Sequence, residues 1–313
     1  MTPQKILITG GFGFIGARFV KHFQAKDIEV VVMEYPSANV PQDFPECEVV
    51  RADITDRSFI ETLKVNNVDA VIHLAAQSSG PRSFSIPDVD VKINIFGTLN
   101  IIDWCLANSI DRLLFASSFV IYGDHPELEA LDEETRFIPK SVYATSKLAC
   151  ENLLKTYAEP KGIKWSALRM FNVYGPGQDI TKGDQGLVGI FMNMLLQQDS
   201  LQVKGSLERF RDLIHVDDVI QGWDLCLHTN KFNESYNLGS GSKTTFKDLI
   251  ECLANIMGKS ARLKIELLPG TPGDMMGCYA DISKIKSDLG FSPKYDLESG
   301  VRDMYEWVIN NKK

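Results

Sequence analysis

The sequence predicts an α/β fold, a doubly wound parallel sheet with a second, smaller lobe. Three features predict it. Short β-rich runs alternate with helical patterns along the first half of the chain, as in a parallel sheet with crossover helices. The runs VVVM and AVIHLA are apolar throughout, as strands are when helices cover both faces of a sheet. A glycine-rich turn, GGFGFIG, directly follows the first run.

The elements are expected in a regular order up to Tyr174. Beyond this residue the stretch YGPGQDITKGDQG is dense in glycine and turn formers, and the later pieces look shorter and mixed. We therefore predict a first domain at 1–174, which also takes in about 213–240, and a second lobe made mainly of 175–313. Strands are predicted at 5–9, 28–34, 47–53, 69–75, 111–118 and 164–170, and helices before Gln24, near 57–66, near 88–108 and at 141–158.

Composition excludes several classes of protein. The chain has 313 residues, 33 basic and 41 acidic side chains, and a formal net charge of −8. That sign argues against binding to nucleic acid or to an anionic membrane, although it allows a local basic pocket for one diphosphate. No apolar stretch approaches the roughly 20 residues that span a bilayer, and the six cysteines lack the spacing of a zinc site. We expect a cytoplasmic protein with reduced thiols and no metal.

The glycine-rich turn predicts a pyrophosphate site. Gly10, Gly13 and Gly16 are spaced by three and lead from a strand into a helical pattern. Such glycines allow a tight turn and bring the helix N-terminus close to a pyrophosphate. Glu34 ends the second strand, where its carboxylate can bind the adenosine ribose and repel a 2′-phosphate, and no Lys or Arg follows in YPSANV. NAD is therefore favoured over NADP. Asp53-Ile54 either contacts the adenine or only begins a helix.

Ten fragments in a fixed order resemble a known family. In this order they are similar to the extended short-chain dehydrogenases/reductases, specifically the NAD-dependent nucleotide-sugar epimerases and dehydratases. The resemblance implies a Rossmann domain that binds NAD and a lobe that binds a nucleotide-diphosphate sugar. The fragments are TGGFGFIG, ADI at 52–54, HLAAQ at 73–77, Asn94 with Gly97-Thr98, SSFVIYG at 117–123, YATSK at 143–147, LRMFNVYGPGQ at 168–178, RFRDLIHVDDV at 209–219, YNLGSG at 236–241 and PGDMMGCYAD at 272–281.

The resemblance extends the set of residues expected to contact NAD beyond the glycine loop. The full set is Gly10, Gly13, Phe14, Ile15, Gly16, Glu34, Asp53, Ile54, Leu74, Ala75, Ala76, Gln77, Asn94, Tyr143 and Lys147.

Tyr143 and Lys147 lie four residues apart in a predicted helix, so both side chains project from one face. An unperturbed tyrosine is a poor base at neutral pH, because its pKa is about 10. A cation about 4 Å away contributes roughly 4 kcal/mol at an effective dielectric of about 20, or about three pKa units. Lys147 and the positive nicotinamide are therefore predicted to bring the pKa of Tyr143 close to neutrality, for use as a general base. The resemblance adds Ser118 as the partner of the reacting hydroxyl, with Ser117 as the alternative.

The two residues after Ser118 bear on the reaction. In the family, 4,6-dehydratases and decarboxylases carry an acid, or an Asp-Glu pair, just after this serine, because elimination needs an additional acid and base. This chain has Phe119 and Val120, and neither can transfer a proton. Dehydration and decarboxylation are thus disfavoured, which leaves epimerisation or the one-way reduction of a keto sugar.

The resemblance also implies a substrate site. Asn172 would bind the sugar or its diphosphate, Arg211 a phosphate, and Asp274 the nucleoside ribose. A guanidinium is in any case the natural bidentate partner of phosphate. Thr271 stands where galactose-type epimerases have a second arginine that binds the diphosphate. The substrate would therefore bind more weakly, the nucleotide would be a different one, or Arg209 would extend into the site and take this role.

Two small residues suggest a roomy sugar pocket. Cys278 matches a position that is a bulky tyrosine in epimerases restricted to plain hexoses, and Gly186 replaces an asparagine of the same wall. Both would leave space for an N-acetyl group, although packing in the core is the alternative for Cys278.

These features together favour an NAD-dependent 4-epimerase that resembles UDP-glucose 4-epimerases, acts on UDP-glucose and UDP-galactose, and has room for the N-acetyl forms. A 4-keto nucleotide-sugar reductase is the main alternative; a UDP-glucuronate-type 4-epimerase and a non-catalytic NAD-binding scaffold are weaker ones. His73 and His215 are expected to be structural. The apolar stripe of the helix near 88–108 fits either a homodimer interface or burial against the sheet.

Overall fold

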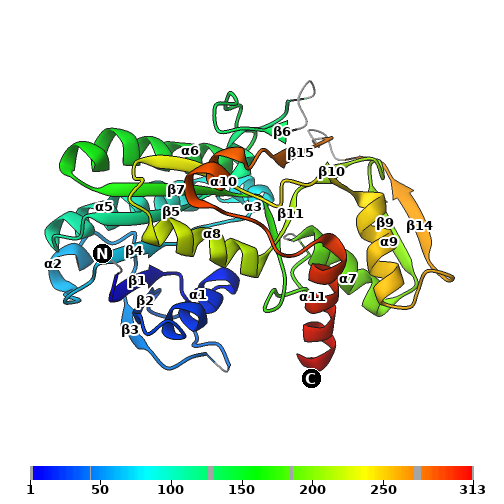
Figure 1. Cartoon of the computed structure of the whole chain (residues 1–313), viewed down its shortest axis with the longest axis horizontal. Helices are drawn as coiled ribbons and strands as arrows, with labels where there is room; N and C mark the ends of the chain where they lie inside the picture. Colours follow the sequence, from blue (N-terminus) through cyan, green and yellow to red (C-terminus); the bar gives the residue numbers. More distant parts are fainter. Residues whose placement is uncertain (1–2, 43, 126–129, 184–185, 271–275, 312–313) are drawn as a thin grey trace.

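A seven-stranded, all-parallel sheet forms the centre of the computed structural model, which describes residues 3–42, 44–125, 130–183, 186–270 and 276–311 (Figure 1). The strand order is β12-β7-β5-β4-β1-β2-β3. The predicted α/β class and parallel sheet are thereby confirmed. The strands are β1 (Lys5–Thr9), β2 (Glu29–Glu34), β3 (Glu48–Arg51), β4 (Ala70–His73), β5 (Arg112–Ser118), β7 (Lys164–Met170) and β12 (Glu234–Leu238).

Helices cover both faces of this sheet, which explains why its strands are apolar on both sides. Figure 1 shows α6 above strands β5 and β7, and α8 below them. One face buries Phe19 and Trp223 against the sheet, and the other buries Trp104 and Cys150. The helices of the first face are α1 (Phe14–Gln24), α8 (Val216–His228) and α10 (Ser283–Leu289), and those of the second are α2 (Phe59–Thr62), α5 (Gly97–Ala107) and α6 (Val142–Leu153).

Three predicted helices differ from those observed. The helix predicted near 57–66 is only α2, because Leu63 already has extended backbone angles. The helix predicted near 88–108 consists of α4 (Pro87–Val91), a π-helical turn and α5. The helix predicted at 141–158 also passes into a π-helical turn after α6. The π-helical segments are Lys92–Phe96 and Leu154–Ala158.

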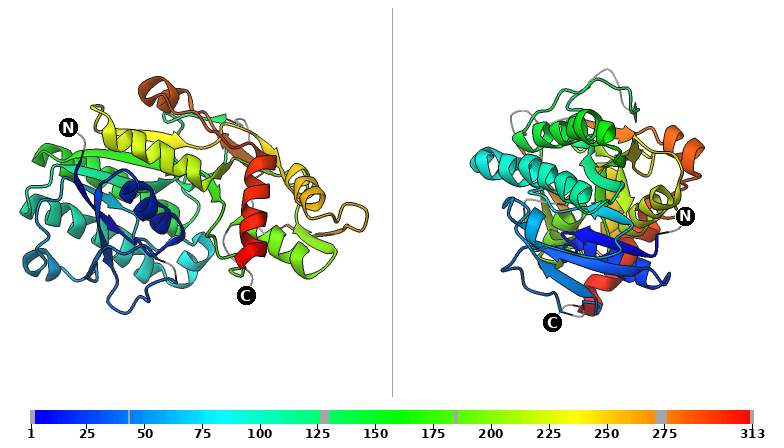
Figure 2. Two further views of the ribbon diagram at one scale, coloured as in Figure 1. Left: turned by 60° about the horizontal axis from the view of Figure 1, so that its bottom comes forward. Right: turned by 90° about the vertical axis from the view of Figure 1, so that its left-hand side faces the viewer.

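The second lobe lies beside the large sheet in Figures 1 and 2, and it has a hydrophobic core of its own. Three helices and β9 contribute to this core, and β14 pairs with β9. The strands after Tyr174 are short and mixed with helices, as expected, whereas these helices are as long as those of the first domain. These elements are α7 (Leu187–Gln197), α9 (Phe246–Ile256), the 15-residue α11 (Leu297–Asn311), β9 (Ser200–Lys204) and β14 (Lys264–Leu268).

Two small sheets lie beside this lobe. The first has the order β13-β10-β15-β6, and the second pairs β11 with β8. The chain then returns to the large sheet, where α8 packs on one face and β12 pairs with β7. None of the described helices combines the length and apolar character needed to cross a membrane. The strands are β6 (Ala130–Leu131), β8 (Asn172–Tyr174), β10 (Phe210–Arg211), β11 (Leu213–His215), β13 (Thr244–Thr245) and β15 (Gly277–Ala280).

Candidate active site

A cavity of about 1470 Å³ lies between the carboxyl ends of the sheet strands and the second lobe. One wall comes from residues at the ends of β1, β2, β4, β5 and β7, and the other from α7, β9, β10 and the start of α9. Ligands of open parallel sheets bind at this edge, where the strand order reverses. Here the reversal falls between β1 and β4. The fold therefore positions the cavity for a dinucleotide.

The glycine loop forms part of this wall, and its backbone requires glycine. Gly10 has a φ of +72°, and a Cβ on Gly16 would lie 2.4 Å from the carbonyl oxygen of Gly10. The helix α1 begins directly after Gly13, and no side chain caps it. Its first backbone amides are therefore available to a phosphate group, which fits the pyrophosphate of NAD.

The ribose end of the cavity carries the predicted acid. Glu34 lines the cavity, and its carboxylate accepts a hydrogen bond from the amide of Phe12 at 3.0 Å. Arg51, which no sequence motif identified, pairs with Glu34 in the register of β2 and β3. Its guanidinium donates instead to the carbonyls of Tyr35 and Ala38, at 3.1 and 2.6 Å. Arg51 is thus held on the loop after β2 and does not line the cavity.

Of the residues predicted to contact NAD, Gln77 and Asn94 do not line the cavity. Both are buried, and the Asn94 side chain bonds the backbone N and O of Gln77, at 2.9 and 3.0 Å, and Ser146 Oγ at 3.0 Å. Asn94 therefore ties the loop after β4 to α6. The predicted residues that do line the cavity are Gly10, Gly13, Phe14, Ile15, Gly16, Glu34, Asp53, Ile54, Leu74, Ala75, Ala76, Tyr143 and Lys147.

The structure brings the three predicted catalytic side chains together at the cavity wall. Tyr143 and Lys147 lie in α6, whose first turn is capped by a hydrogen bond from the amide of Ala144 to Ser141. Ser118 ends β5 and forms a hydrogen bond with Tyr143. The neighbouring Ser117 hydroxyl donates instead to a buried carboxylate of α6. Ser118 is therefore the serine beside the tyrosine.

The pKa of Tyr143 reflects mainly its burial. Burial raises it to about 12, although the hydrogen bond with Ser118 lowers it. The Lys147 ammonium lies 5.9 Å from the Tyr143 ring centre and donates to the carbonyl of Ala116 at 2.7 Å. Burial also lowers the pKa of Lys147, to about 8. Desolvation of the phenol therefore dominates the pKa in the protein without NAD, and the depression expected from Lys147 together with the positive nicotinamide stays a prediction.

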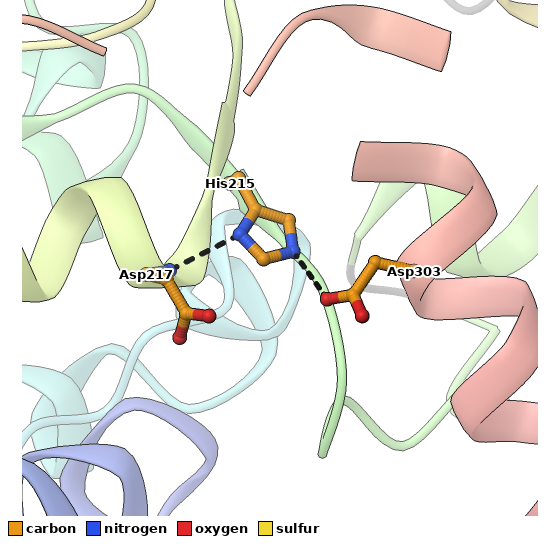
Figure 3. Close-up of side chains that lie close together, drawn as sticks. All are labelled: His215, Asp217 and Asp303. Carbon is orange, nitrogen blue, oxygen red and sulfur yellow. Dashed lines mark hydrogen bonds and ion pairs between the residues drawn. The ribbon is translucent and has the colours of Figure 1, made fainter. Parts of the chain in front are cut away.

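The two histidines singled out in the sequence do not line the cavity. His73 lies between the hydroxyls of Thr9 and Thr98, at 2.7 and 3.1 Å. Figure 3 shows His215 between two aspartates: its Nδ1 accepts from the amide of Asp217, and its Nε2 is 3.2 Å from Asp303.

His215, Asp217 and Asp303 could together hold a cation. Asp217, however, already pairs with Arg18 at 2.9 Å. His215 caps the first turn of α8 and pairs with Asp303 of α11. The three side chains therefore serve as a structural tie between these two helices.

The second-lobe wall of the cavity is basic. Asn172 and Arg211 line it as predicted, and so do Arg209, Lys182 and Lys204. Both arginines lie over the ring of Phe246, a cavity residue that no sequence motif identified. Their guanidinium carbons are 4.9 and 5.6 Å from its centre. Asp274 and Thr271 fall outside the described residues.

The two small residues differ in their relation to the cavity, because Gly186 lines it and Cys278 does not. Cys278 is 2% exposed and packs against Tyr122 and Phe171 in a small core, so core packing accounts for it. A Cβ on Gly186 would lie 2.3 Å from Nε2 of Gln178, whose side chain therefore fills the space expected to be open. Cys278 thus gives no support to the expected room for an N-acetyl group, whereas at Gly186 that room stays a prediction.

A dinucleotide cradle beside a buried tyrosine, lysine and serine defines an NAD-dependent enzyme of the short-chain dehydrogenase type. Residues 6–239 match the model of the NAD dependent epimerase/dehydratase family, and the chain belongs to this family. NAD is accordingly its cofactor.

The relatives of this chain include both epimerases and dehydratases. A putative UDP-glucose 4-epimerase of Methanocaldococcus jannaschii is 34% identical over 98% of this chain and 99% of its own. A dTDP-glucose 4,6-dehydratase of Actinoplanes sp. is 31% identical over 99% of both. The crystal structure of the Thermotoga maritima UDP-glucose 4-epimerase with UDP-glucose superposes with a TM-score of 0.91, at 30% identity over 98% of this chain and 99% of that one. The chain is thus a nucleotide-sugar epimerase/dehydratase.

Proposed function

We propose that this enzyme is an NAD-dependent 4-epimerase of nucleotide-diphosphate sugars, with UDP-glucose and UDP-galactose as substrates. The observation that carries the proposal is the cavity wall directly after Ser118. Phe119 and Val120 both line the cavity there, and the Phe119 ring stacks on Phe171 with centres 5.0 Å apart. A wall of this kind offers no additional proton donor for the elimination of water from the neighbouring carbon. Epimerisation at the fourth carbon requires no such additional donor.

The chain's own residues supply the acid–base chemistry. Ser118 orients the 4-hydroxyl of the sugar, and the Tyr143 phenolate takes its proton. When bound, NAD accepts and returns the hydride, and its oxidised ring adds the positive charge that lowers the pKa of a nearby phenol. Burial of Ser118, Tyr143 and Lys147 strengthens their interactions with the developing oxyanion.

The nucleotide end of the substrate is proposed to lie against the second lobe. The four cations Lys182, Lys204, Arg209 and Arg211 line that wall, and no acidic residue of the described part of this lobe does. Such a wall suits a diphosphate. We accordingly propose that 1–174 with about 213–240 binds NAD and that 175–313 mainly binds the substrate.

The cellular setting is also a proposal. All six cysteines are free thiols, as is usual in a reducing cytoplasm. Phe84 and Phe96, on either side of α4 in the chain, are large apolar side chains with 63% and 55% exposure. We propose that this surface is the contact of a homodimer, and light scattering of the Phe96→Glu variant would test it.

Product analysis tests the function. Purified protein is incubated with UDP-glucose, UDP-galactose or their N-acetyl forms, without added cofactor, and the sugars are followed by proton NMR. Interconversion of 4-epimers supports the proposal. Formation of a 4-keto-6-deoxy sugar would identify a dehydratase. Reaction of a 4-keto sugar only with added reduced nicotinamide would identify a reductase.

A further inference from the structure

A buried ion pair lies directly behind the catalytic side chains. Glu151 is 1% exposed and lies one helical turn after Lys147 in α6. Its carboxylate accepts from Arg169 Nε at 3.0 Å and from Nη2 at 2.8 Å. Arg169, in β7, is also 1% exposed. The two groups form a bidentate pair with no access to solvent.

This pair joins the catalytic helix to three strands of the large sheet. The Ser117 hydroxyl of β5 donates to Glu151 at 2.5 Å, and the Ser235 hydroxyl of β12 donates to it at 3.2 Å. Ser117 directly precedes Ser118, and it pairs with Arg169 in the register of β5 and β7. The separation between α6 and the end of β5 is therefore set by hydrogen bonds through one carboxylate.

The other side of Arg169 fixes the segment that follows Ser118. Its Nη1 donates to the Tyr122 hydroxyl at 2.8 Å and to the carbonyl of Glu133 at 3.0 Å. The Tyr122 hydroxyl in turn donates to Asn237 at 2.6 Å. This segment includes Phe119 and Val120 of the cavity wall. The catalytic helix, the catalytic serine and the wall thus share one polar cluster.

Stability does not account for a pair of this kind. Removing two charges from water costs several kcal/mol per ion, and replacement by apolar side chains of similar volume is often neutral or stabilising. Catalysis, in contrast, is sensitive to small displacements, since a shift of about 1 Å can cost about 100-fold in rate. The hydrogen bonds of the Glu151–Arg169 pair hold α6, which carries Tyr143 and Lys147, at a fixed distance from β5, the strand that ends at Ser118.

We propose that Glu151 and Arg169 are positioning residues, which set Tyr143 and Lys147 of α6 against Ser118 of β5 through the buried ion pair. This inference rests on the proposed function in one respect only, namely which reaction Tyr143, Lys147 and Ser118 catalyse.

Two variants and one control test the role. Glu151→Gln removes the charge and keeps the shape, and the Glu151→Gln/Arg169→Met double variant leaves no unpaired charge. Asp218→Asn is the control, because Asp218 is also a buried carboxylate but bonds only the amides of Lys294 and Tyr295. The thermal midpoint, NAD content, KM and kcat are measured for each.

Both Glu151 variants are expected to lose about 100-fold in kcat at an unchanged KM. We expect the double variant to recover the thermal midpoint that the single variant loses, and Asp218→Asn to lose stability at an unchanged kcat. A double variant with a normal kcat would overturn the positioning role, whatever its thermal midpoint.

A second readout does not depend on turnover. The pKa of Tyr143 in the NAD-loaded protein is obtained from tyrosinate absorbance, with Tyr143→Phe as the reference. We expect it to rise in both Glu151 variants, because a displaced α6 weakens the hydrogen bond with Ser118. An unchanged pKa would overturn the inference even if the enzyme proved to be a dehydratase.

Discussion

Opposing effects act on the pKa of a single residue, Tyr143. Burial of the phenol raises the pKa to about 12, and only the hydrogen bond with Ser118 opposes this. Lys147, with its own pKa lowered to about 8 by burial, loses its proton as the pH rises above that value. The protein alone therefore keeps the base protonated at neutral pH. In the proposed mechanism the positive charge of oxidised NAD, when bound, would lower this pKa and so help Tyr143 to take the proton.

Replacing Tyr143 by Phe removes the general base and keeps the ring. We expect kcat to fall by about 100- to 10,000-fold, while NAD content and binding of UDP stay unchanged. Tyr157→Phe is the matched control, because the Tyr157 hydroxyl donates to Asp103 of α5, away from the cavity. Steady-state kinetics of both variants decide the point, and a Tyr143→Phe enzyme with normal kcat would refute the assigned base.

His73 makes the fold sensitive to acid. Burial and, secondarily, Lys147 lower its pKa from 6.5 to about 3. Because the folded pKa lies below the unfolded one, the stabilisation is complete above about pH 6.5 and is lost as the pH falls toward 3. We expect about 2 kcal/mol of unfolding free energy to be lost through this group between about pH 7 and about pH 4.5. Urea unfolding at both values should show a smaller loss in His73→Gln, and an equal loss would contradict this assignment.

At the scale of elements, the close contact of α1 with the glycine loop matters most for the cofactor. The helix begins directly after the loop, so that its first amides face the cavity. This approach is possible only because Gly16 has no side chain, since a Cβ there would lie 2.7 Å from Gly11 Cα. The sequence pattern alone is sufficient to predict this contact, because all its residues are neighbours in the chain.

Gly16→Ala is therefore expected to displace α1 from the loop. We expect NAD affinity to fall by about tenfold or more, a loss of at least about 1.4 kcal/mol. Gly270→Ala is the control, because a Cβ at Gly270 would meet nothing closer than Gly205 Cα at 3.6 Å. Calorimetric titration with NAD measures both, and an unchanged affinity in Gly16→Ala would contradict the proposed cradle.

At the scale of the whole molecule, the site lies between a large sheet and a lobe with its own core. Six of the seven strands of the large sheet, the glycine loop and the spacing of Tyr143 and Lys147 follow from local sequence patterns, so the sequence was enough to predict them, whereas β12 was not predicted as a strand. Contacts between residues that are distant in the chain were not predictable. Burial of Cys278, the position of Gln178 beside Gly186, and the Glu151–Arg169 pair all depend on how separate elements pack.

The basic wall of the second lobe should govern substrate affinity rather than the chemical step. Arg211→Ala removes a charged donor of the kind that contributes about 1.5 to 3 kcal/mol per hydrogen bond, so KM should rise by about tenfold or more at an unchanged kcat. Arg302→Ala removes the same charge from α11, where Arg302 pairs with Glu298, and should leave both constants unchanged. A fall in kcat alone for Arg211→Ala would contradict a role in binding.

The fate of the hydrogen on the sugar's fourth carbon tests the central claim most directly. UDP-glucose deuterated at this carbon is given to the purified enzyme without added cofactor, and the products are analysed by NMR and mass spectrometry. We predict UDP-galactose that keeps the deuterium at the same carbon, because the hydride leaves and returns within one site. A product that carries the deuterium on another carbon, or no conversion until reduced nicotinamide is supplied, would contradict the epimerase.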